Sequence, residues 1–327
     1  MTLYIIRRVF NYAVLTLVAA CFAYMLASLG LDPAWEYLLR NPPAPPETIE
    51  SIYNRLGVNP DVPLLQRTWT WLTNIFTEGS LGLTVGYQPV TAQIAIRAGV
   101  SLQLLLVGSI VGAIVGVILG VWGAVRQYRF SDRVVTILSY LVIATPTIVM
   151  AIVLMIVATN VNQALGFQLI NFSGQYSPGV ADSFWPQFWD RISHLILPTF
   201  VLILAAGASY SRYQRNAMLD VLGADYIRTA RAKGRTRGSA LVRHGVRVAL
   251  IPMSTFFAYS FGTLVAGSAI LELMFGWHGM GEMAIQAVRQ NDINSVAGST
   301  LFVAILILCS STLSEVLYAA LDPRVRR

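Results

Sequence analysis

The sequence predicts an all-α membrane protein with six transmembrane helices. Of its 327 residues, 55% are hydrophobic and 12% are charged, and the mean hydropathy is +0.61. Soluble domains carry about 25% charged residues, so composition excludes a water-soluble fold. The apolar residues also gather into runs long enough to cross a hydrocarbon layer of roughly 30 Å. The expected spans are 9–31, 98–125, 134–161, 192–211, 248–271 and 293–321.

The first span is expected to stay in the membrane as an anchor. Arg7 and Arg8 precede the uncharged run 9–31, and the pattern is not that of a cleaved signal peptide. We therefore expect an N-terminal transmembrane helix within segment 1–31.

The distribution of Lys and Arg predicts the orientation. With the N-terminus inside, the inner segments are the N-terminus, 126–133, 212–247 and the tail 322–327, and they hold 17 of the 23 Lys and Arg residues but only 4 of the 16 acids. Inner loops of membrane proteins are enriched in these cations. Both termini are therefore expected to be cytoplasmic. The net charge of +7 reflects topology, so nucleic acid is not an expected partner.

The expected cytoplasmic loop 212–247 contains the longest basic stretch between two spans. Within it, Met218, Leu222 and Tyr226 recur at every fourth position, so a helix through them would carry a narrow apolar stripe. Gly223 interrupts this pattern, and we expect it to end a first helix in a left-handed turn.

A second, short helix is expected from Tyr226 to Lys233. Asp225 can cap its first turn and Gly234 can end it. Arg231 and Lys233 would lie in the last turn, where cations offset the negative end of the helix dipole. The pattern alone leaves two interpretations open, a docking element or a solvated loop whose arginines only fix the topology.

The residues of this short helix resemble a family motif. They are Asp225, Tyr226, Arg228, Thr229, Ala230, Arg231, Ala232, Lys233 and Gly234, followed by Arg243, His244 and 249–252. They are similar to the EAA loop of binding-protein-dependent ABC importer permeases, in the DYxRTARAKG variant of the oligopeptide and dipeptide permeases. The eponymous Glu is absent, with Arg228 at its position, and the spacing from Gly234 to Pro252 is longer. Both departures resemble the peptide branch.

The resemblance implies a type I ABC importer transmembrane fold, with its transmembrane domain at 98–321. It implies that residues 225–234 dock in a groove of a separate ATPase, and that the protein lies in the bacterial inner membrane. The implied partners are a second related permease subunit, two ATP-binding subunits or domains, and an extracytoplasmic peptide-binding protein. No cofactor is expected in this chain, because ATP and Mg would be bound by the ATPase subunits. The substrate stays open among oligopeptides, dipeptides, glutathione, haem and nickel complexes.

An extracytoplasmic excursion is expected from 32 to 97. After a stiff Pro-rich connector, a first helix is predicted from about Glu47 to Leu56, ending at Gly57. A second helix opens at Pro63 and carries Leu65, Trp69, Leu72 and Phe76 on one face, with Trp71 nearby. This amphipathic helix is interpreted as lying on the outer membrane surface. A receptor-contact surface is the alternative.

Glycine and proline mark particular points in the spans. The second span carries Gly108, Gly112, Gly116, Gly120 and Gly123, a spacing that lets another helix approach closely. We expect packing within the chain, with a subunit interface as the alternative. Pro146 and Pro198 are each expected to kink a span, with a gating role as a further possibility.

The remaining polar residues give few candidate sites. Trp277 is expected in the headgroup layer, in an outer loop that resembles the family stretch but lacks its usual Pro after Asp292. Cys21 and Cys309 are expected to be packed hydrophobes without a disulfide, and His244 a surface residue without a metal. Glu315, near the inner end of the last span, is interpreted as a structural ion-pair partner, with proton coupling as the alternative.

No motif for catalysis is found. The single lysine, Lys233, is not preceded by a glycine, so a P-loop is excluded, and HExxH, CxxC and GxSxG motifs are absent. The chain is therefore expected to be non-catalytic, with any ATP-driven work supplied by a separate subunit. An ion- or proton-coupled secondary transporter is the alternative function, and a channel or scaffold is a third.

Overall fold

A computed structural model describes residues 2–321, with side chains described except at residues 2–5, 237 and 258–267. The chain divides into two compact units. One unit comprises 103–277 and the segment from Cys309 onwards, and the other comprises 2–102 and 278–308. Among the described residues the extended structure is limited to one isolated bridge, between Leu83 and Pro89. The all-α prediction is confirmed.

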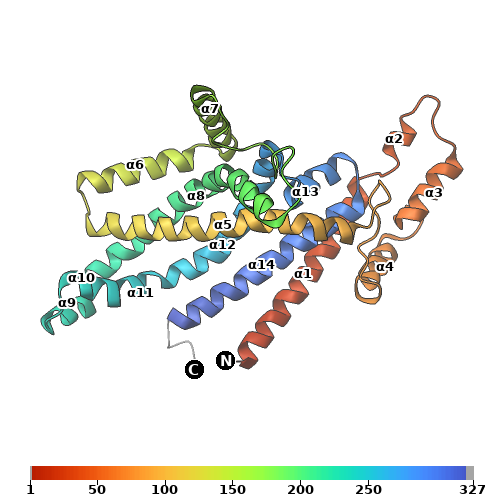
Figure 1. Ribbon diagram of the computed structural model, residues 1–327. Coiled ribbons are helices and arrows are strands. Elements are labelled where there is room, and N and C mark those ends of the chain that lie inside the picture. The colour runs from red at the N-terminus through yellow and green to blue at the C-terminus, as the bar shows by residue number, and fades with distance from the viewer. Residues whose placement is uncertain (1, 322–327) are drawn as a thin grey trace. The chain divides into compact units, whose positions relative to one another are not determined.

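The helices follow one another through both units (Figure 1). The first helices are α1 (Thr2–Gly30), α2 (Trp35–Leu38), α3 (Pro46–Leu56), α4 (Leu64–Thr77) and α5 (Val90–Val125). They are followed by α6 (Phe130–Ala144), α7 (Thr147–Leu165), α8 (Phe184–Leu222), α9 (Asp225–Ala232) and α10 (Arg237–Ala240). A π-helical turn (Leu241–Gly245) leads into α11 (Val246–Ala249), α12 (Ile251–Phe275), α13 (Met280–Arg289) and α14 (Ile293–Leu321).

Within the described part of the chain, five helices are long and apolar enough to cross a membrane, namely α1, α5, α7, α8 and α14. The predicted fifth span corresponds to α12, whose side chains from 258 to 267 lie outside the description. The count of six spans therefore stays a prediction. Large apolar side chains are widely exposed on these helices, for example Phe22, Ile118 and Ile156. Such exposure is expected where lipid or a partner chain covers the surface.

The third predicted span is divided into two helices. Thr145 takes an extended conformation (φ −90°, ψ 122°) between α6 and α7, because a residue before proline is disfavoured in the helical region. Pro146 was predicted to kink one continuous helix. This prediction was wrong, because Pro146 separates two helices, α6 and α7. Pro198 lies inside α8, which continues through it.

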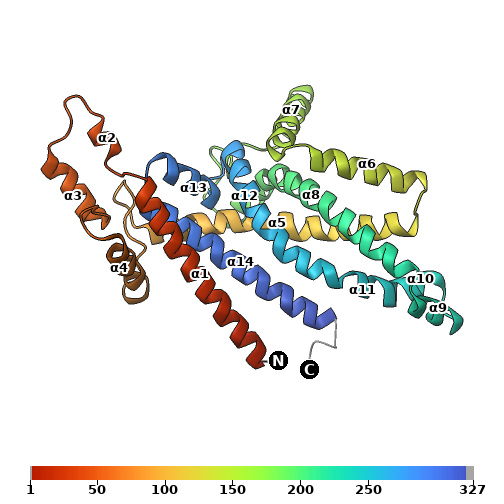
Figure 2. The ribbon, with the colours of Figure 1, turned by 180° about the vertical axis from the view of Figure 1, so that it is seen from behind.

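The glycines of α5 make close packing against α8 possible. A Cβ at Gly112 would lie 2.7 Å from Ala206 Cβ, and one at Gly116 would lie 2.4 Å from Tyr210 Cβ and 2.7 Å from the Gly207 carbonyl. The glycine face is therefore filled by a helix of the same chain, as predicted. Helix α8 also lies beside α12 in both views (Figure 1, Figure 2), and the Tyr210 ring meets the Phe256 ring edge-on with centroids 5.0 Å apart.

The segment between α12 and α14 contains a tight turn after α12 and a side-chain cap at the start of α14. Gly276 adopts φ +66°, and the next amide, that of Trp277, donates to the Glu272 carbonyl at 2.7 Å. This turn folds Trp277 back, and its side chain is fully buried, 5.9 Å below the Arg191 guanidinium. Its predicted place in the headgroup layer was wrong. At the start of α14, Asp292 caps the helix by accepting a hydrogen bond from the Ser295 amide at 3.0 Å.

Candidate functional site

The candidate site is the predicted cytoplasmic segment around α9. The part of this segment before Gly223 is not a separate helix, because α8 runs unbroken for 39 residues from Phe184 through the predicted fourth span to Leu222. Gly223 follows in a right-handed conformation (φ −89°, ψ −6°). The predicted left-handed turn at Gly223 was therefore wrong. A Cβ at Gly223 would meet nothing within 4 Å, so the conformation of this chain does not require a glycine there.

The start of α9 differs in detail from the prediction. The residue before the helix is Ala224, and Asp225 is the first helical residue, with no side-chain capping bond. Asp225 lies instead 3.8 Å from Arg228 in an exposed ion pair. A carboxylate in the first turn still complements the positive end of the helix dipole, an effect of about 0.3–1 kcal/mol at an exposed position.

Gly234 ends α9 as predicted, and the geometry shows why a glycine stands there. It adopts φ +86°, and the Gly234 amide donates to the Arg231 carbonyl at 3.0 Å while the Arg235 amide donates to the Ala230 carbonyl at 3.3 Å. This pair of bonds is a Schellman motif, whose left-handed residue is usually glycine. A Cβ at Gly234 would meet nothing within 4 Å, so the requirement is backbone conformation and not space.

The two faces of α9 differ sharply. Ile227 is buried, and Ala224 and Ala230 on the same face are partly buried. The other predicted site residues are exposed, namely Asp225, Tyr226, Arg228, Thr229, Arg231, Ala232, Lys233 and Gly234. Tyr226 was predicted to continue the apolar stripe, but it is 41% exposed. The break at residues 223 and 224 resets the helical phase, so Ile227 takes the inward position.

Ile227 attaches α9 to the ends of several helices. It belongs to a cluster of buried apolar side chains, which we call the anchor cluster. The members of this cluster are Ala124 of α5, Met218 and Val221 of α8, Ile227 of α9, Ala240 at the end of α10, Leu241 at the start of the π-helical turn and Ala249 of α11. A displacement of α9 therefore acts on α5, on α8 and on the segment that leads into α12.

The segment after α9 contains a π-helical turn where one regular helix was predicted. Residues 239–251 were expected to form that helix, but Leu241–Gly245 has π-helical bonding between α10 and α11. Its last residue, Gly245, lies against α8, and a Cβ there would be 3.0 Å from Val221 Cγ1. His244 within the turn is exposed, as predicted. Arg247 then donates to the Leu321 carbonyl at 3.2 Å, which ties α11 to the end of α14.

A partly buried ion pair joins α6 to α8 at the same end. Arg215 donates to both carboxylate oxygens of Asp132, from Nε at 2.7 Å and from Nη2 at 2.9 Å, and the Tyr128 amide adds a third bond at 3.0 Å. The hydrogen bonds from Arg215 hold the pKa of the Asp132 carboxyl below its ordinary value. Asp132 is only 3% exposed. The Arg215 side chain is 23% exposed, so the pair is partly buried, and it fixes the first turn of α6 to α8.

Sequence reasoning missed both Ile227 and the Asp132–Arg215 pair. The sequence did contain a signal for Ile227, because it is the one large aliphatic residue in the sequence of α9, DYIRTARA. The ion pair had no signal in the sequence, because its partners are 83 positions apart.

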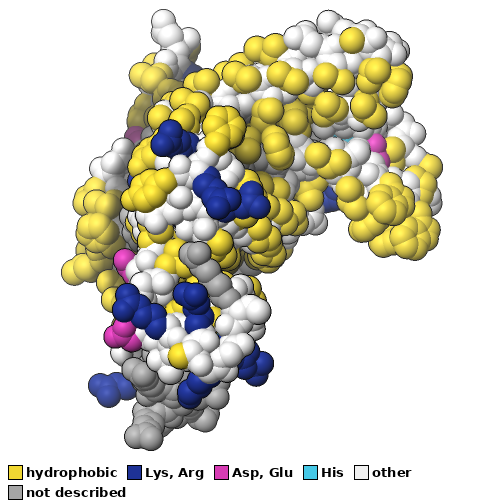
Figure 3. Space-filling model, turned by 90° about the vertical axis from the view of Figure 1, so that its left-hand side faces the viewer, with side chains coloured by type: hydrophobic (Ala, Val, Ile, Leu, Met, Phe, Trp, Pro, Cys, Tyr) yellow, Lys and Arg dark blue, Asp and Glu magenta, His cyan; other side chains and the backbone are white. Residues whose placement is uncertain are grey.

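The exposed surface of this end is basic. Figure 3 faces the side of the molecule on which α9 and α10 lie, and Lys and Arg side chains are more abundant there than Asp and Glu. The exposed cations of the two predicted inner loops are Arg126, Arg129, Arg133, Arg228, Arg231, Lys233, Arg243 and Arg247. Asp220 and Asp225 are the exposed acids of these loops among the described residues.

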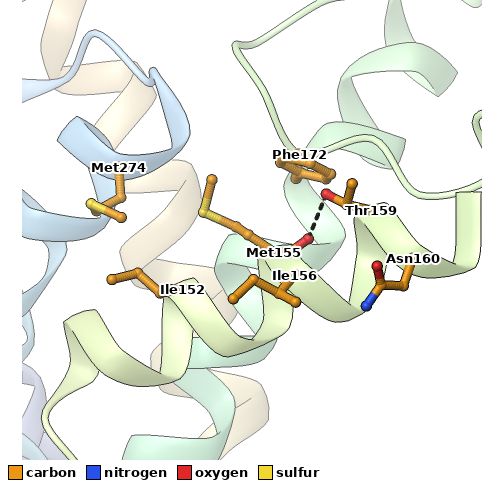
Figure 4. A pocket seen from close by; sticks show the side chains of 7 residues that line it. All are labelled: Ile152, Met155, Ile156, Thr159, Asn160, Phe172 and Met274. Carbon is orange, nitrogen blue, oxygen red and sulfur yellow. Dashed lines mark hydrogen bonds between the residues drawn. The ribbon is translucent and has the colours of Figure 1, made fainter. Parts of the chain in front are cut away.

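A pocket elsewhere in the same unit is a second candidate for a functional site. It has a volume of about 310 Å³ and lies between α7, the following loop and α12, lined by Ile152, Met155, Ile156, Thr159, Asn160, Phe172 and Met274 (Figure 4). The Thr159 hydroxyl already donates to the Met155 carbonyl at 2.8 Å. No lining residue is charged, so the pocket has no side chain that could form an ion pair with the charged ends of a peptide. The residues that line the substrate pathway therefore stay unassigned.

Comparison with known proteins identifies the family. The sequence model of the family described as "Binding-protein-dependent transport system inner membrane component" matches residues 112–327, which include α9 and the anchor cluster. The chain belongs to this family. The resemblance inferred from residues 225–234 is thereby confirmed, and the protein is a multi-pass membrane permease.

Relatives that align over nearly the full length of this permease are named as permease proteins of transport systems. The oligopeptide transport system permease protein OppB of Mycobacterium tuberculosis is 50% identical over 326 residues, covering 100% of this chain and 99% of the relative. The oligopeptide transport system permease protein AppB of Bacillus subtilis is 32% identical, with 99% of both chains covered. The glutathione transport system permease protein GsiC of Salmonella typhi is 29% identical, covering 99% of this chain and 98% of the relative.

Proposed function

We propose that this permease is one of two transmembrane subunits of an ATP-driven importer and forms half of the pathway for peptides. The observation that carries the proposal is the construction of α9, a short helix with one buried anchor, Ile227, and an exposed basic face. The apolar side of α9 packs on its own chain, so its exposed basic side is available to meet an acidic surface of another subunit. The names of the two oligopeptide permeases at 50% and 32% identity support peptides as the substrate class.

Coupling in this proposal is mechanical. The exposed face of α9, from Asp225 to Gly234, would sit in a groove of an ATPase subunit, and closure of the ATPases would displace it. The anchor cluster transfers that displacement to α8, a helix of 39 residues or about 58 Å. The Asp132–Arg215 pair and the close contacts of Gly112 and Gly116 make α5 and α6 follow α8. The membrane pathway would then alternate between inward and outward access.

The proposal includes partners that this chain does not supply. They are a second related permease, two ATP-binding subunits or domains that hold ATP and Mg, and an extracytoplasmic peptide-binding protein. Both termini would be cytoplasmic in the bacterial inner membrane. The basic residues of the tail that contribute to this orientation, Arg324, Arg326 and Arg327, lie outside the described residues. The peptide-binding protein would set the choice of substrate.

The competing function is a secondary transporter coupled to ions or protons. Glu315, the acid expected in the last span, is half-buried in α14. Its predicted role as a structural ion-pair partner stays a prediction. A proton-coupled mechanism would make uptake depend on this carboxylate and on a pH gradient, independently of ATP.

Reconstitution into proteoliposomes separates the two functions. The complete complex, with the binding protein and labelled oligopeptide on one side and ATP on the ATPase side, is expected to accumulate peptide. Uptake should stop when the ATPase subunits are inactivated or the binding protein is omitted, and it should persist after an ionophore collapses the ion gradients. Uptake that follows an imposed proton gradient without ATP would overturn the proposal.

A further inference from the structure

We propose that α4 lies in the outer leaflet of the membrane as an interfacial helix and anchors the excursion that follows α1. This inference does not depend on α9 or on the transported substrate. It rests on three sectors around the axis of α4, each with a different chemistry, and on the point at which α4 contacts α1.

The first sector faces protein. Arg67, Thr68 and Trp71 are buried, and the Trp71 ring stacks on Tyr24 of α1 with centroids 5.0 Å apart. The Trp71 Nε1 also donates to the Leu81 carbonyl at 3.2 Å, and the Arg67 Nη1 donates to the Val58 carbonyl at 2.9 Å. This side of α4 is therefore fixed to α1 and to the loops on either side of α4.

The second sector is apolar and exposed. Leu65, Trp69 and Phe76 have exposed fractions of 73%, 66% and 66%. These positions fall within about 40° of one another on a helix of 3.6 residues per turn. The third sector is polar and exposed, and comprises Gln66, Thr70 and Thr77, centred about 100° from the apolar sector. A helix that lies between protein, lipid and water needs one sector for each.

The contact with Tyr24 places α4 at membrane depth. Tyr24 lies about two turns before Leu31, the end of the predicted first span, which corresponds to about 10 Å along the helix. On α1 itself, Phe22, Leu26 and Leu29 have exposed fractions of 61%, 53% and 73%, so apolar side chains are exposed along this end of α1 as well as on α4. Interfacial helices bury their apolar face roughly 5–10 Å into the membrane. Lipid is therefore the occupant that fits the apolar sector.

The charges of α4 agree with this position. The helix contains no acid, and its one cation, Arg67, is buried against a backbone carbonyl. The exposed apolar sector is therefore free of charged side chains that hydrocarbon would have to cover. Trp69 in that sector is also a residue type enriched at membrane interfaces.

Spin labels on single cysteines test the inference in the full complex in lipid nanodiscs. Cys21 and Cys309 are first replaced by alanine, and Trp69→Cys and Phe76→Cys are compared with Gln66→Cys and Thr70→Cys on the same helix. Labels at 69 and 76 are expected to be several-fold more accessible to oxygen than to a water-soluble nickel chelate. Labels at 66 and 70 are expected to show the reverse order.

Two outcomes would overturn the inference. Equal accessibility of all four labels to the nickel chelate would place the apolar sector in water. In the second outcome, the nickel chelate reaches the labels at 69 and 76, and this access is lost only when the binding protein is added. The apolar sector would then be a receptor-contact surface. All four positions are exposed, so the substitutions leave the buried contacts of Trp71 and Arg67 intact. A monodisperse gel-filtration peak and a wild-type melting temperature for each labelled complex confirm that it is folded.

Discussion

Replacement of Gly234 by leucine is expected to abolish the coupling of ATP hydrolysis to peptide uptake while the permease still reaches the membrane. Gly234 has φ +86° and supports two hydrogen bonds that close the end of α9. A side chain in this conformation costs about 1–3 kcal/mol, so the last turn of α9 would open. The exposed residues Arg231 and Lys233 would then lose their fixed positions. The measurement is the amount of peptide transported per ATP hydrolysed by the reconstituted complex.

Gly223→Leu is the matched control for this prediction. Both glycines flank α9, and a Cβ at either would meet nothing within 4 Å. Only Gly234 has a left-handed backbone, since Gly223 has φ −89°. The control is therefore expected to keep most of the uptake per ATP. Equal coupling in the two variants and in the wild type would show that the geometry of the end of α9 is not needed.

The second large effect is expected at Gly116, where leucine should prevent the permease from folding in the membrane. Its Cβ would lie 2.4 Å from Tyr210 Cβ and 2.7 Å from the Gly207 carbonyl, and a backbone atom cannot move aside as a flexible side chain can. Overpacking of a core costs about 1–3 kcal/mol when side chains can adjust, and here α5 and α8 must separate. We expect little or no monodisperse protein after extraction and gel filtration.

Gly99→Leu is the control in the same helix. Gly99 is an exposed position of α5, and a Cβ there would meet nothing within 4 Å. This variant should be recovered at the wild-type level with an unchanged melting temperature. Recovery of folded Gly116→Leu at the same level would contradict the close packing of α5 on α8.

Much of this fold was predicted from short sequence patterns, namely glycines at helix ends, long apolar runs and glycine spacing. These patterns determine structure through interactions between residues that are close in the sequence. Gly57 ends α3 with φ +71°, and Gly234 ends α9 in the same way with φ +86°, so these two helix ends were predicted from their glycines, whereas the left-handed turn predicted at Gly223 was wrong. The apolar run 293–321 coincides with α14 for the same reason. The glycine spacing of α5 predicted a close helix neighbour within the chain, and α8 is that neighbour.

The features that were missed depend on contacts between distant residues or on a change of helical phase. Trp277 was predicted at the lipid interface from its residue type, but the turn at Gly276 folds it inward under Arg191. Tyr226 was predicted to lie on the apolar stripe, but Ile227 takes the buried position, because the break at residues 223 and 224 shifts the register of α9 against α8. The effect of Pro146 was underestimated, because a pattern of apolar residues does not distinguish one kinked helix from two helices.

The measurement that tests the central claim most directly is an electron cryo-microscopy structure of the assembled complex with ATP bound. The account predicts that α9 lies in a groove of an ATP-binding subunit, with Arg228, Arg231 and Lys233 in the contact and Ile227 still packed on Met218 and Val221. A structure in which the exposed face of α9 contacts only solvent would contradict it.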